Sequence, residues 1–330
     1  MERMVANLCT QDTQNTNFAI IMLTKENIPK PNFFIVGAPK CGTTALADYL
    51  GDHPQVFMST PKEPHYFADN FPGYRVVSDL DGYLSLFSGA DLDTPVVGEA
   101  SVYYLYSKTA VANIKAFDPD ARLVVMLRNP VDMVHSLHTQ LLFTLNENEP
   151  DFMTAWRLQG DRLSGKFIPK YCKDTAMLQY HAVANYSEQL KRLYKHFPKE
   201  QVKIILFDDF KDDVRHTYED VLDFLNLYSD ERANFDVVNA SHIQRSKLLS
   251  VMLRVKPKPI RQMWAMAKKL TGASDEIGQK IGHWLEKSNT RYHARKSLTK
   301  NERVIIAASF KEDINMLENL LDRSLESWRS

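Results

Sequence analysis

The stretch from Asn32 to Leu50 constrains the fold more than any other part of this chain, because it predicts a β-strand running directly into an α-helix. Its first residues form an apolar, β-prone run, and its last seven carry apolar side chains at the i, i+3, i+4 spacing of one helix face. Gly37 and Gly42 bound the loop between them. Small residues at such a turn let backbone N–H groups approach an anion closely. The stretch therefore predicts a strand–loop–helix unit that can hold a phosphate-like group.

Lys40 lies inside this loop, and its position indicates which kind of anion site is expected. Gly37 and Gly42 enclose four residues, as in a Walker A loop, but a Walker A sequence needs Lys directly after the second Gly, where this chain has Thr43. A cation in a tight turn has no packing role, whereas it can pair with an anion at the positive end of a helix dipole. Thr43 or Thr44 can cap that helix. The alternative is a strand–helix turn without a ligand, which is common.

Further strands alternate with helices along the chain. Arg122–Arg128 encloses a continuous apolar run of the kind buried on both faces of a parallel sheet. Short strands are also expected at 56–58, 95–101 and 202–207, and helices at 79–88, 107–117, 131–143, 175–196 and 214–225, with an almost entirely helical region from Ser241 that ends in Lys300–Leu321. This alternation predicts an α/β fold with a doubly wound parallel sheet, in which ligands lie beyond the carboxyl ends of the strands.

Chemically useful side chains follow these strand ends. Glu63 lies in a Pro-flanked loop after the second strand, where an exposed ion pair with Lys62 is the default interpretation and a general base is the functional one. His65 competes for that role, because an imidazole needs no tuning of its pKa near neutral pH. Arg128 alone would be expected to form a salt bridge. Ser136 follows eight residues later, across a strand–turn–helix, so the two side chains can converge on one tetrahedral anion.

The charge balance excludes some classes of partner. The 330 residues hold 41 Lys plus Arg and 41 Asp plus Glu, so no global field favours nucleic acid or an anionic membrane. The longest apolar run near the N-terminus, Phe18–Leu23, is far short of a membrane span. We expect residues 1–30 to be a leader or a packed arm before a single domain at 31–330. A local bias exists, since residues 254–303 carry thirteen Lys or Arg against four acidic residues.

The three cysteines, Cys9, Cys41 and Cys172, are widely spaced and predict neither a disulfide framework nor a Cys/His metal cluster. A reducing, cytoplasmic compartment is therefore expected. Cys41 suggests a phosphatase nucleophile, but that chemistry needs an Arg six residues later, and this chain has Ala47 there. We therefore interpret Cys41 as a small loop residue.

Three segments, taken together, resemble one enzyme family. They are P-K-C-G-T-T at 39–44, K-E-P-H-Y-F at 62–67 and R-N-P-V-D-M-V-H-S at 128–136. In this order they resemble the sulfotransferases that use 3′-phosphoadenosine 5′-phosphosulfate (PAPS). The branch they resemble most includes bacterial small-molecule enzymes and heparan sulfate sulfotransferase domains. The resemblance runs from about Phe33 to the C-terminus and implies a P-loop-like fold.

The resemblance also implies roles for residues of this chain. Lys40 and the loop around it would hold the 5′-phosphosulfate, Glu63 would be the catalytic base with His65 as its rival, and a basic segment would close over the nucleotide. The implied donor-binding residues are Lys40, Cys41, Gly42, Thr43, Thr44, Arg128, Ser136, Arg291, Arg295 and Lys296. No metal is required by this plan, since transfer needs a cation on the bridging oxygen and Lys40 is one.

The chain departs from the glycan enzymes of that family after Glu99, where Ala100 stands in place of a Lys and Val102 in place of a Pro. Both differences favour a small-molecule acceptor that offers a hydroxyl or an amine. The loops 66–78 and 143–174 are expected to wall its pocket. Their aromatic side chains are Tyr66, Phe67, Phe71, Tyr74, Phe143, Trp156 and Phe167.

Two other functions stay open on the sequence alone. A nucleotide-dependent kinase would need Mg²⁺ ligands and the Walker Lys, neither of which we can place. A non-catalytic nucleotide-binding module would hold the nucleotide without consuming it. His135 and His138 indicate a helix face and not a metal site, because no acidic or Cys partner accompanies them.

Overall fold

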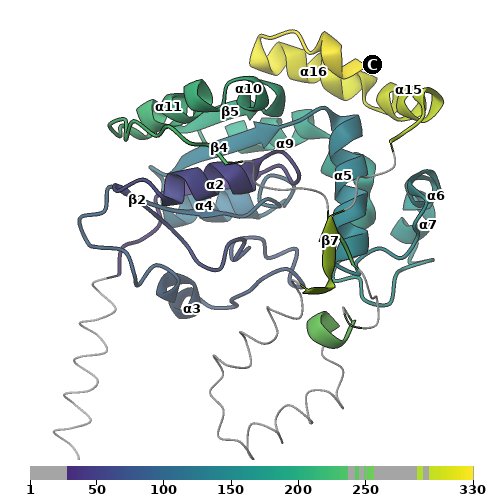
Figure 1. The fold of residues 1–330 in the computed structure, drawn as a ribbon, viewed down its shortest axis with the longest axis horizontal. Coiled ribbons are helices and arrows are strands. Elements are labelled where there is room, and N and C mark those ends of the chain that lie inside the picture. Colours follow the sequence, from purple (N-terminus) through teal and green to yellow (C-terminus); the bar gives the residue numbers. More distant parts are fainter. Residues whose placement is uncertain are drawn as a thin grey trace, which may run out of the picture.

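A parallel β-sheet forms the centre of the structure (Figure 1). The computed structural model describes residues 28–236, 242–244, 249, 251–255, 288–292 and 297–329. The strands of the sheet are β1 Phe33–Gly37, β2 Val56–Met58, β3 Val96–Ala100, β4 Arg122–Leu127 and β5 Val202–Leu206. They lie in the order β2-β3-β1-β4-β5, and all neighbours pair in parallel. The predicted α/β fold and its strands are confirmed.

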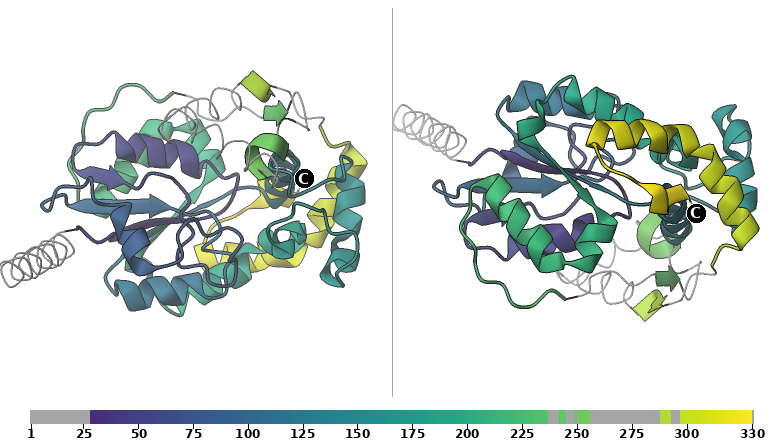
Figure 2. Two further views of the ribbon diagram at one scale, coloured as in Figure 1. Left: turned by 90° about the horizontal axis from the view of Figure 1, so that it is seen from below. Right: turned by 90° about the horizontal axis from the view of Figure 1, so that it is seen from above.

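Helices cover both faces of this sheet (Figure 2). α2 and α11 lie on one side, and α4 and α9 lie on the other, which is the doubly wound arrangement. The α-helices of the described residues are α2 Thr43–Gly51, α3 Leu80–Ser85, α4 Ala110–Phe117, α5 Pro130–Phe143, α6 Phe152–Arg157, α7 Gln159–Leu163, α8 Tyr180–Val183, α9 Tyr186–Tyr194, α10 Phe207–Asp212, α11 Val214–Leu225, α15 Lys300–Ser309 and α16 Lys311–Leu321. None of them combines the length and the apolar character that crossing a membrane requires.

The central strands are buried because they are almost entirely apolar. β1 and β3 are buried at every position, and β4 is buried after its first residue. Phe33 of β1 pairs with Gly98 of β3, and a Cβ at Gly98 would lie only 2.6 Å from the Phe33 ring. This close packing fixes the register of the two strands, and with it the level at which β1 ends.

β1 ends in an irregularity that opens the loop before α2. Its register with β4 shifts between Ile35 and Gly37. Gly37 has φ 151°, and a Cβ there would lie 2.9 Å from the carbonyl oxygen of Val102. A glycine is therefore required at the point where the chain leaves the sheet and turns into α2.

The prediction of one long helix over 175–196 is wrong. The chain forms a 3₁₀ turn at Thr175–Leu178, then the short α8, and then α9. α9 starts anew because Asp313 of α16 accepts the backbone N–H groups of Tyr186 at 3.1 Å and Ser187 at 2.9 Å. A carboxylate that caps a helix from a distant element is a tertiary contact, so local periodicity does not predict it.

The prediction of an almost entirely helical region from Ser241 is wrong in part. β6 His242–Gln244 and β7 Thr290–Tyr292 form an antiparallel pair. The helical end expected over 300–321 is confirmed as α15 and α16, which are separated at Phe310. Most of the basic 254–303 segment lies outside the described residues, as does the N-terminal stretch 1–27.

The C-terminal part of the chain packs against α5. β6 contacts α5, and β7 pairs with β6. An ion pair between Arg303 Nη1 and Asp132 Oδ1, at 2.7 Å, joins α15 to the first turn of α5. These contacts position α5, which forms one wall of the site described next.

Candidate active site

The carboxyl ends of β1, β2, β3 and β4 meet at one edge of the sheet, because these strands are parallel. A cavity of about 130 Å³ lies at this edge. It is lined by Pro39, Lys40, Gly42, Thr43, Thr44, Glu63, Val102, Tyr103, Leu137 and Gln140. The structure therefore brings Glu63 together with most of the loop that the sequence assigned to the donor.

The loop between β1 and α2 has the features of an anion site. Gly42 is the N-cap of α2 with φ 91°, and a Cβ there would lie 3.1 Å from the Phe207 ring. The first N–H groups of a helix have no intrahelical partner, so the start of α2 offers hydrogen-bond donors. Lys40 has φ 62°, and its Nζ donates to Gln140 Oε1 at 3.0 Å. Lys40 also lines the cavity, so the loop brings a cation to it.

Cys41 does not line this cavity. Its side chain is fully buried, and its Sγ lies 3.3 Å from the carbonyl oxygen of Pro39. Burial raises the pKa of the thiol to about 12, so the group is neither a thiolate nor a nucleophile at neutral pH. A role of Cys41 in donor binding is therefore limited to its backbone N–H.

Glu63 lies where the loop after β2 meets the loop after β1. Lys62 Nζ donates to Thr44 Oγ1 at 2.7 Å and lies 3.5 Å from Glu63 Oε1. Glu63 Oε2 lies 3.5 Å from His65 Nε2. Burial raises the pKa of Glu63, but the contacts with His65 and Lys62 outweigh burial and hold the pKa below its ordinary value of 4.5. The carboxylate is therefore ionised at neutral pH and can accept a proton.

His65 lies behind Glu63. Its side chain is 3% exposed, against 39% for Glu63, and its ring stacks on Tyr103 with the centroids 5.3 Å apart. Apart from the 3.5 Å approach of Nε2 to Glu63, neither ring nitrogen of His65 has a polar partner within the described residues. Because Glu63 lines the cavity and His65 does not, the geometry favours Glu63 as the group that meets an acceptor.

Arg128, directly after β4, contacts the backbone of the loop between β1 and α2. Its Nη1 donates to the carbonyl oxygen of Lys40 at 3.3 Å, and its Cζ lies 4.6 Å from the centroid of the Phe207 ring. Ser136 lies on α5, directly before the cavity-lining Leu137. Arg128 and Ser136 are both half-buried, and neither lines the 130 Å³ cavity. Their convergence on one phosphate stays a prediction.

We expect Arg128→Ala to weaken binding of 3′-phosphoadenosine 5′-phosphate (PAP) by roughly 1.5–3 kcal/mol and to change binding of adenosine monophosphate little. The two nucleotides differ by the 3′-phosphate, which a guanidinium binds through charge-assisted hydrogen bonds. Titration calorimetry with both nucleotides measures the difference. Arg122→Ala is the matched control, because that guanidinium bonds to the Phe224 carbonyl at the opposite end of β4. Equal losses for both nucleotides would contradict the assignment.

The aromatic side chains expected to wall the acceptor pocket are mostly used elsewhere. Those packed into the core or against other rings are Tyr66, Phe67, Phe71 and Trp156. Phe167 is 65% exposed. Tyr74 does approach the site, with its ring centroid 6.0 Å from that of His65 and 5.1 Å from that of Tyr103. The expected aromatic wall is therefore formed only in part.

Five residues that line the cavity are not among the site residues predicted from the sequence: Pro39, within the predicted loop, and Val102, Tyr103, Leu137 and Gln140. Val102 and Tyr103 follow the end of β3, a position that the parallel-sheet rule would have indicated. Leu137 and Gln140 lie on one face of α5, three residues apart. No local signal marks these two, because the packing of α5 on the sheet decides which of its faces meets the cavity.

The basic segment expected to close over the nucleotide is described only in part. Arg291 lies in β7, opposite Ile243 of β6. Arg295 and Lys296 lie outside the described residues. Their contact with the nucleotide stays a prediction.

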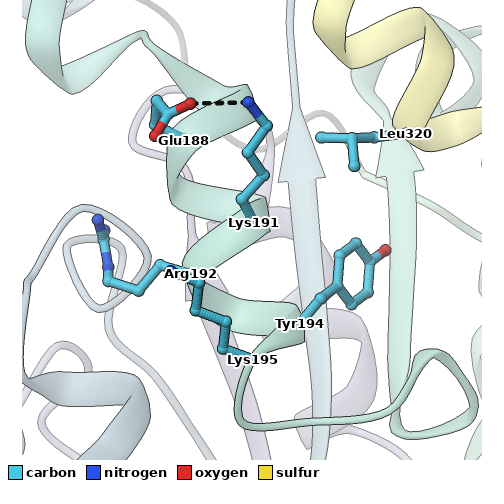
Figure 3. Close-up of a pocket in the computed structure, with 6 residues that line it drawn as sticks. All are labelled: Glu188, Lys191, Arg192, Tyr194, Lys195 and Leu320. Carbon is cyan, nitrogen blue, oxygen red and sulfur yellow. Dashed lines mark hydrogen bonds and ion pairs between the residues drawn. The ribbon is translucent and has the colours of Figure 1, made fainter.

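A second hollow, of about 550 Å³, lies on α9 away from the predicted site residues (Figure 3). It is lined by Glu188, Lys191, Arg192, Tyr194, Lys195 and Leu320. Lys191 Nζ donates to Glu188 Oε1 at 2.8 Å, and Arg192 Nη2 donates to the Leu105 carbonyl at 2.6 Å. None of the predicted site residues that the structure describes lines this hollow, whereas the smaller cavity at the strand ends gathers Lys40 and Glu63, so the smaller cavity is the better candidate for the active site.

Residues 30–254 match the family model of the sulfotransferase domain. The chain belongs to the sulfotransferase family. It is 28% identical over 246 residues to human carbohydrate sulfotransferase 15, covering 60% of this chain and 44% of that protein. It is 28% identical over 207 residues to human heparan sulfate glucosamine 3-O-sulfotransferase 3A1, covering 63% of this chain and 47% of that protein. The chain thus spans less than half the length of these two curated relatives.

A solved structure extends the similarity over nearly the whole sulfotransferase chain. The sulfotransferase from Alicyclobacillus acidocaldarius is 27% identical, with a TM-score of 0.67, over 92% of this chain and 100% of that one. The family that the three sequence segments predicted is therefore confirmed.

Proposed function

We propose that this protein transfers a sulfuryl group from PAPS to a hydroxyl or an amine of an acceptor. The observation that supports the proposal most is the cavity shared by Lys40, the start of α2 and the Glu63 carboxylate. An anionic donor and an acceptor that loses a proton require a cation and a base within a few ångströms of each other. Membership of the sulfotransferase family agrees with this chemistry.

In-line displacement gives each group of the site a task. The N–H groups at the start of α2 and the Thr44 hydroxyl hold the donor phosphosulfate. Glu63 accepts the acceptor's proton as the acceptor oxygen or nitrogen bonds to sulfur. Lys40 stabilises the charge on the departing phosphate oxygen as its bond to sulfur breaks. The products are the sulfated acceptor and PAP.

For the acceptor we propose a small molecule. The two curated relatives described above are, by name, a carbohydrate and a heparan sulfate sulfotransferase. Ala100 stands where the resemblance expects a Lys of the glycan enzymes, and it is only 1% exposed at the end of β3. A buried methyl group cannot form the charge-assisted hydrogen bonds that a sulfated or uronate sugar would need.

An acceptor panel with radiolabelled PAPS tests both the sulfotransferase activity and the proposed small-molecule acceptor. One arm holds small phenols, alcohols and amines, beginning with 4-nitrophenol, and the other holds unsulfated heparosan and chondroitin oligosaccharides. Transfer to any of these supports the sulfotransferase activity, and transfer in the first arm alone supports a small acceptor. Transfer in the second arm alone contradicts the small acceptor. Absence of transfer, together with absence of PAP binding in calorimetry, would overturn the proposed function.

We expect turnover to persist in excess EDTA. Lys40 and the N-terminus of α2 offer the positive charge that kinases obtain from Mg²⁺. Initial rates measured with and without EDTA, at saturating PAPS, give the comparison. If EDTA abolished turnover and Mg²⁺ restored it, the kinase alternative would replace the sulfotransferase. Nucleotide binding without consumption in either condition would favour a non-catalytic module.

A further inference from the structure

A buried carboxylate that the proposed mechanism does not use lies behind the loop that carries the base. Glu99, in β3, is 0% exposed. Its Oε1 accepts hydrogen bonds from the hydroxyls of Tyr83 at 2.7 Å and Tyr104 at 2.8 Å, and its Oε2 accepts one from Ser101 at 2.6 Å. Burying a carboxylate is unfavourable unless it is hydrogen-bonded, and here neutral hydroxyls supply all three of these bonds. The fold therefore keeps the Glu99 side chain buried although its burial is unfavourable.

Two of the three hydroxyls also hold the loop after β2. Ser101 Oγ accepts the backbone N–H of His65 at 3.0 Å, and the Tyr104 hydroxyl accepts that of Phe67 at 3.3 Å. Each hydroxyl gives its single hydrogen to Glu99, so its lone pairs face the N–H groups. Within the described residues, the hydroxyl of Tyr83 bonds to Glu99 but not to the loop backbone. Glu99 thus orients the two hydroxyl oxygens that accept hydrogen bonds from the loop backbone.

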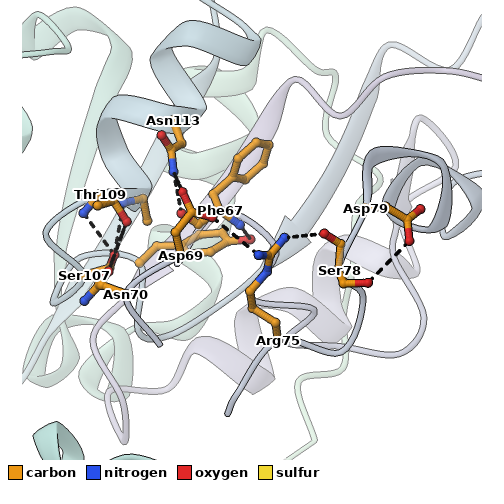
Figure 4. A network of polar contacts seen from close by, with 11 residues as sticks. Phe67, Asp69, Asn70, Arg75, Ser78, Asp79, Ser107, Thr109 and Asn113 are labelled. Carbon is orange, nitrogen blue, oxygen red and sulfur yellow. Dashed lines mark hydrogen bonds and ion pairs between the residues drawn. The ribbon is translucent and has the colours of Figure 1, made fainter. Parts of the chain in front are cut away.

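This loop has a backbone conformation that needs support. Glu63 and His65 have φ values of 62° and 50°, in the left-handed region that residues other than glycine rarely adopt. The far end of the loop is tied to α4, where Asn113 Nδ2 donates to the carbonyl oxygen of Phe67 at 2.9 Å and to Asp69 Oδ2 at 2.7 Å (Figure 4). The bonds to Ser101 and Tyr104, which follow β3, therefore act on the segment between Glu63 and this anchor.

We propose that Glu99 is a positioning residue for the base. Through two hydroxyls it fixes the backbone of residues 65–67 and so keeps the Glu63 carboxylate facing the cavity. Glu99 is not among the residues that line the cavity, so it acts only through this loop. The inference rests on the proposed function, because it takes Glu63 as the base.

The three hydroxyls allow a matched comparison. Ser101→Ala and Tyr104→Phe each remove a bond to Glu99 together with a bond to the loop. Tyr83→Phe removes a bond to Glu99 but leaves the loop bonds intact, so it is the control. Glu99→Gln retains the size of the side chain but cannot accept all three hydroxyl hydrogens.

The first readout is the division of the effect between kcat and KM, with 4-nitrophenol or the best acceptor of the panel. Ser101→Ala, Tyr104→Phe and Glu99→Gln are expected to lower kcat by about 10- to 100-fold, with the KM for PAPS and the affinity for PAP unchanged, because a small displacement of a catalytic group has that effect. Tyr83→Phe should retain the wild-type kcat. A merely structural contribution of the hydroxyls would instead affect all of the variants alike.

The second readout needs no acceptor. In hydrogen exchange followed by mass spectrometry, peptides covering residues 62–68 should exchange faster in Ser101→Ala and Tyr104→Phe than in Tyr83→Phe. Equal kcat and equal exchange in these three variants would overturn the inference. If Ser101→Ala does not fold, the comparison of Tyr104→Phe with Tyr83→Phe tests the inference by itself. If the wild-type protein transfers sulfate to no acceptor, the proposed function fails, and the exchange comparison separately decides whether Glu99 holds the loop.

Discussion

Glu63→Gln is expected to lower kcat by roughly 10²-fold or more and to leave the affinity for PAP nearly unchanged. An amide cannot take the acceptor's proton, whereas a carboxylate whose pKa lies below 4.5 is ionised at neutral pH and can. Glutamine retains the size of the side chain between Lys62 and His65, so the donor loop should keep its shape. Steady-state kinetics and calorimetry with PAP measure the two effects separately.

His65→Ala is the companion variant, because His65 is the rival base. Its ring is buried against Tyr103, so its removal should raise the KM for the acceptor more than it lowers kcat. Glu188→Gln, on the exposed surface of α9, removes a comparable carboxylate and should change neither. If Glu63→Gln kept a near-normal kcat while His65→Ala lost it, the two roles would be reversed.

The second large effect is expected on stability. Arg162 and Glu147 form a bidentate ion pair with both bonds at 2.6 Å and both side chains fully buried, and Tyr180 donates to the same carboxylate at 2.7 Å. Arg162→Met leaves this buried carboxylate without its cation, which typically lowers the free energy of unfolding by about 3–5 kcal/mol. Urea unfolding of the variant and the wild-type protein measures the change.

The sign of the pH dependence follows from the same contacts. Burial raises the pKa of Glu147, but its hydrogen bonds, above all those from Arg162, outweigh burial and hold the folded-state pKa below the ordinary 4.5. The stabilisation is therefore fully present above pH 4.5 and is lost as the pH falls through the folded-state pKa. The difference in unfolding free energy between wild type and Arg162→Met should shrink over that range.

Lys203→Met is the control for this ion pair. It breaks a half-exposed pair with Asp220, at 3.3 Å, and should change the free energy of unfolding by less than about 1 kcal/mol. A loss in Arg162→Met no larger than that in Lys203→Met would contradict the prediction.

The buried ion pair also bears on the site. Asn146, next to Glu147, accepts the backbone N–H of Lys173 at 2.8 Å, and Lys173 Nζ lies 5.5 Å from the centroid of the Tyr74 ring. Tyr74 in turn contacts His65. Loosening the segment around Arg162 should therefore raise the KM for the acceptor before it affects the donor loop.

The strand ends and the helices next to them were largely predictable, because their signals are local. Apolar runs identified the strands of the sheet, and glycines at 37 and 42 identified the loop. The same local reasoning failed between 175 and 196, where the carboxylate of Asp313 starts α9 from a distant helix. It also failed for β6 and β7, which lie far apart in sequence and are short, so each carries too little periodicity to be recognised.

The sequence by itself determined the doubly wound sheet, and it predicted an anion loop with Lys40 and two rival bases, because spacing and glycine positions are properties of neighbouring residues. Only the tertiary structure decided that Glu63 lines the cavity while His65 is buried behind it. It also decided that α5 supplies a wall of that cavity and that the hydroxyls of Ser101 and Tyr104 join Glu99 to the loop. These features depend on how separate strands and helices pack together, and packing between distant segments leaves no local pattern in a single sequence.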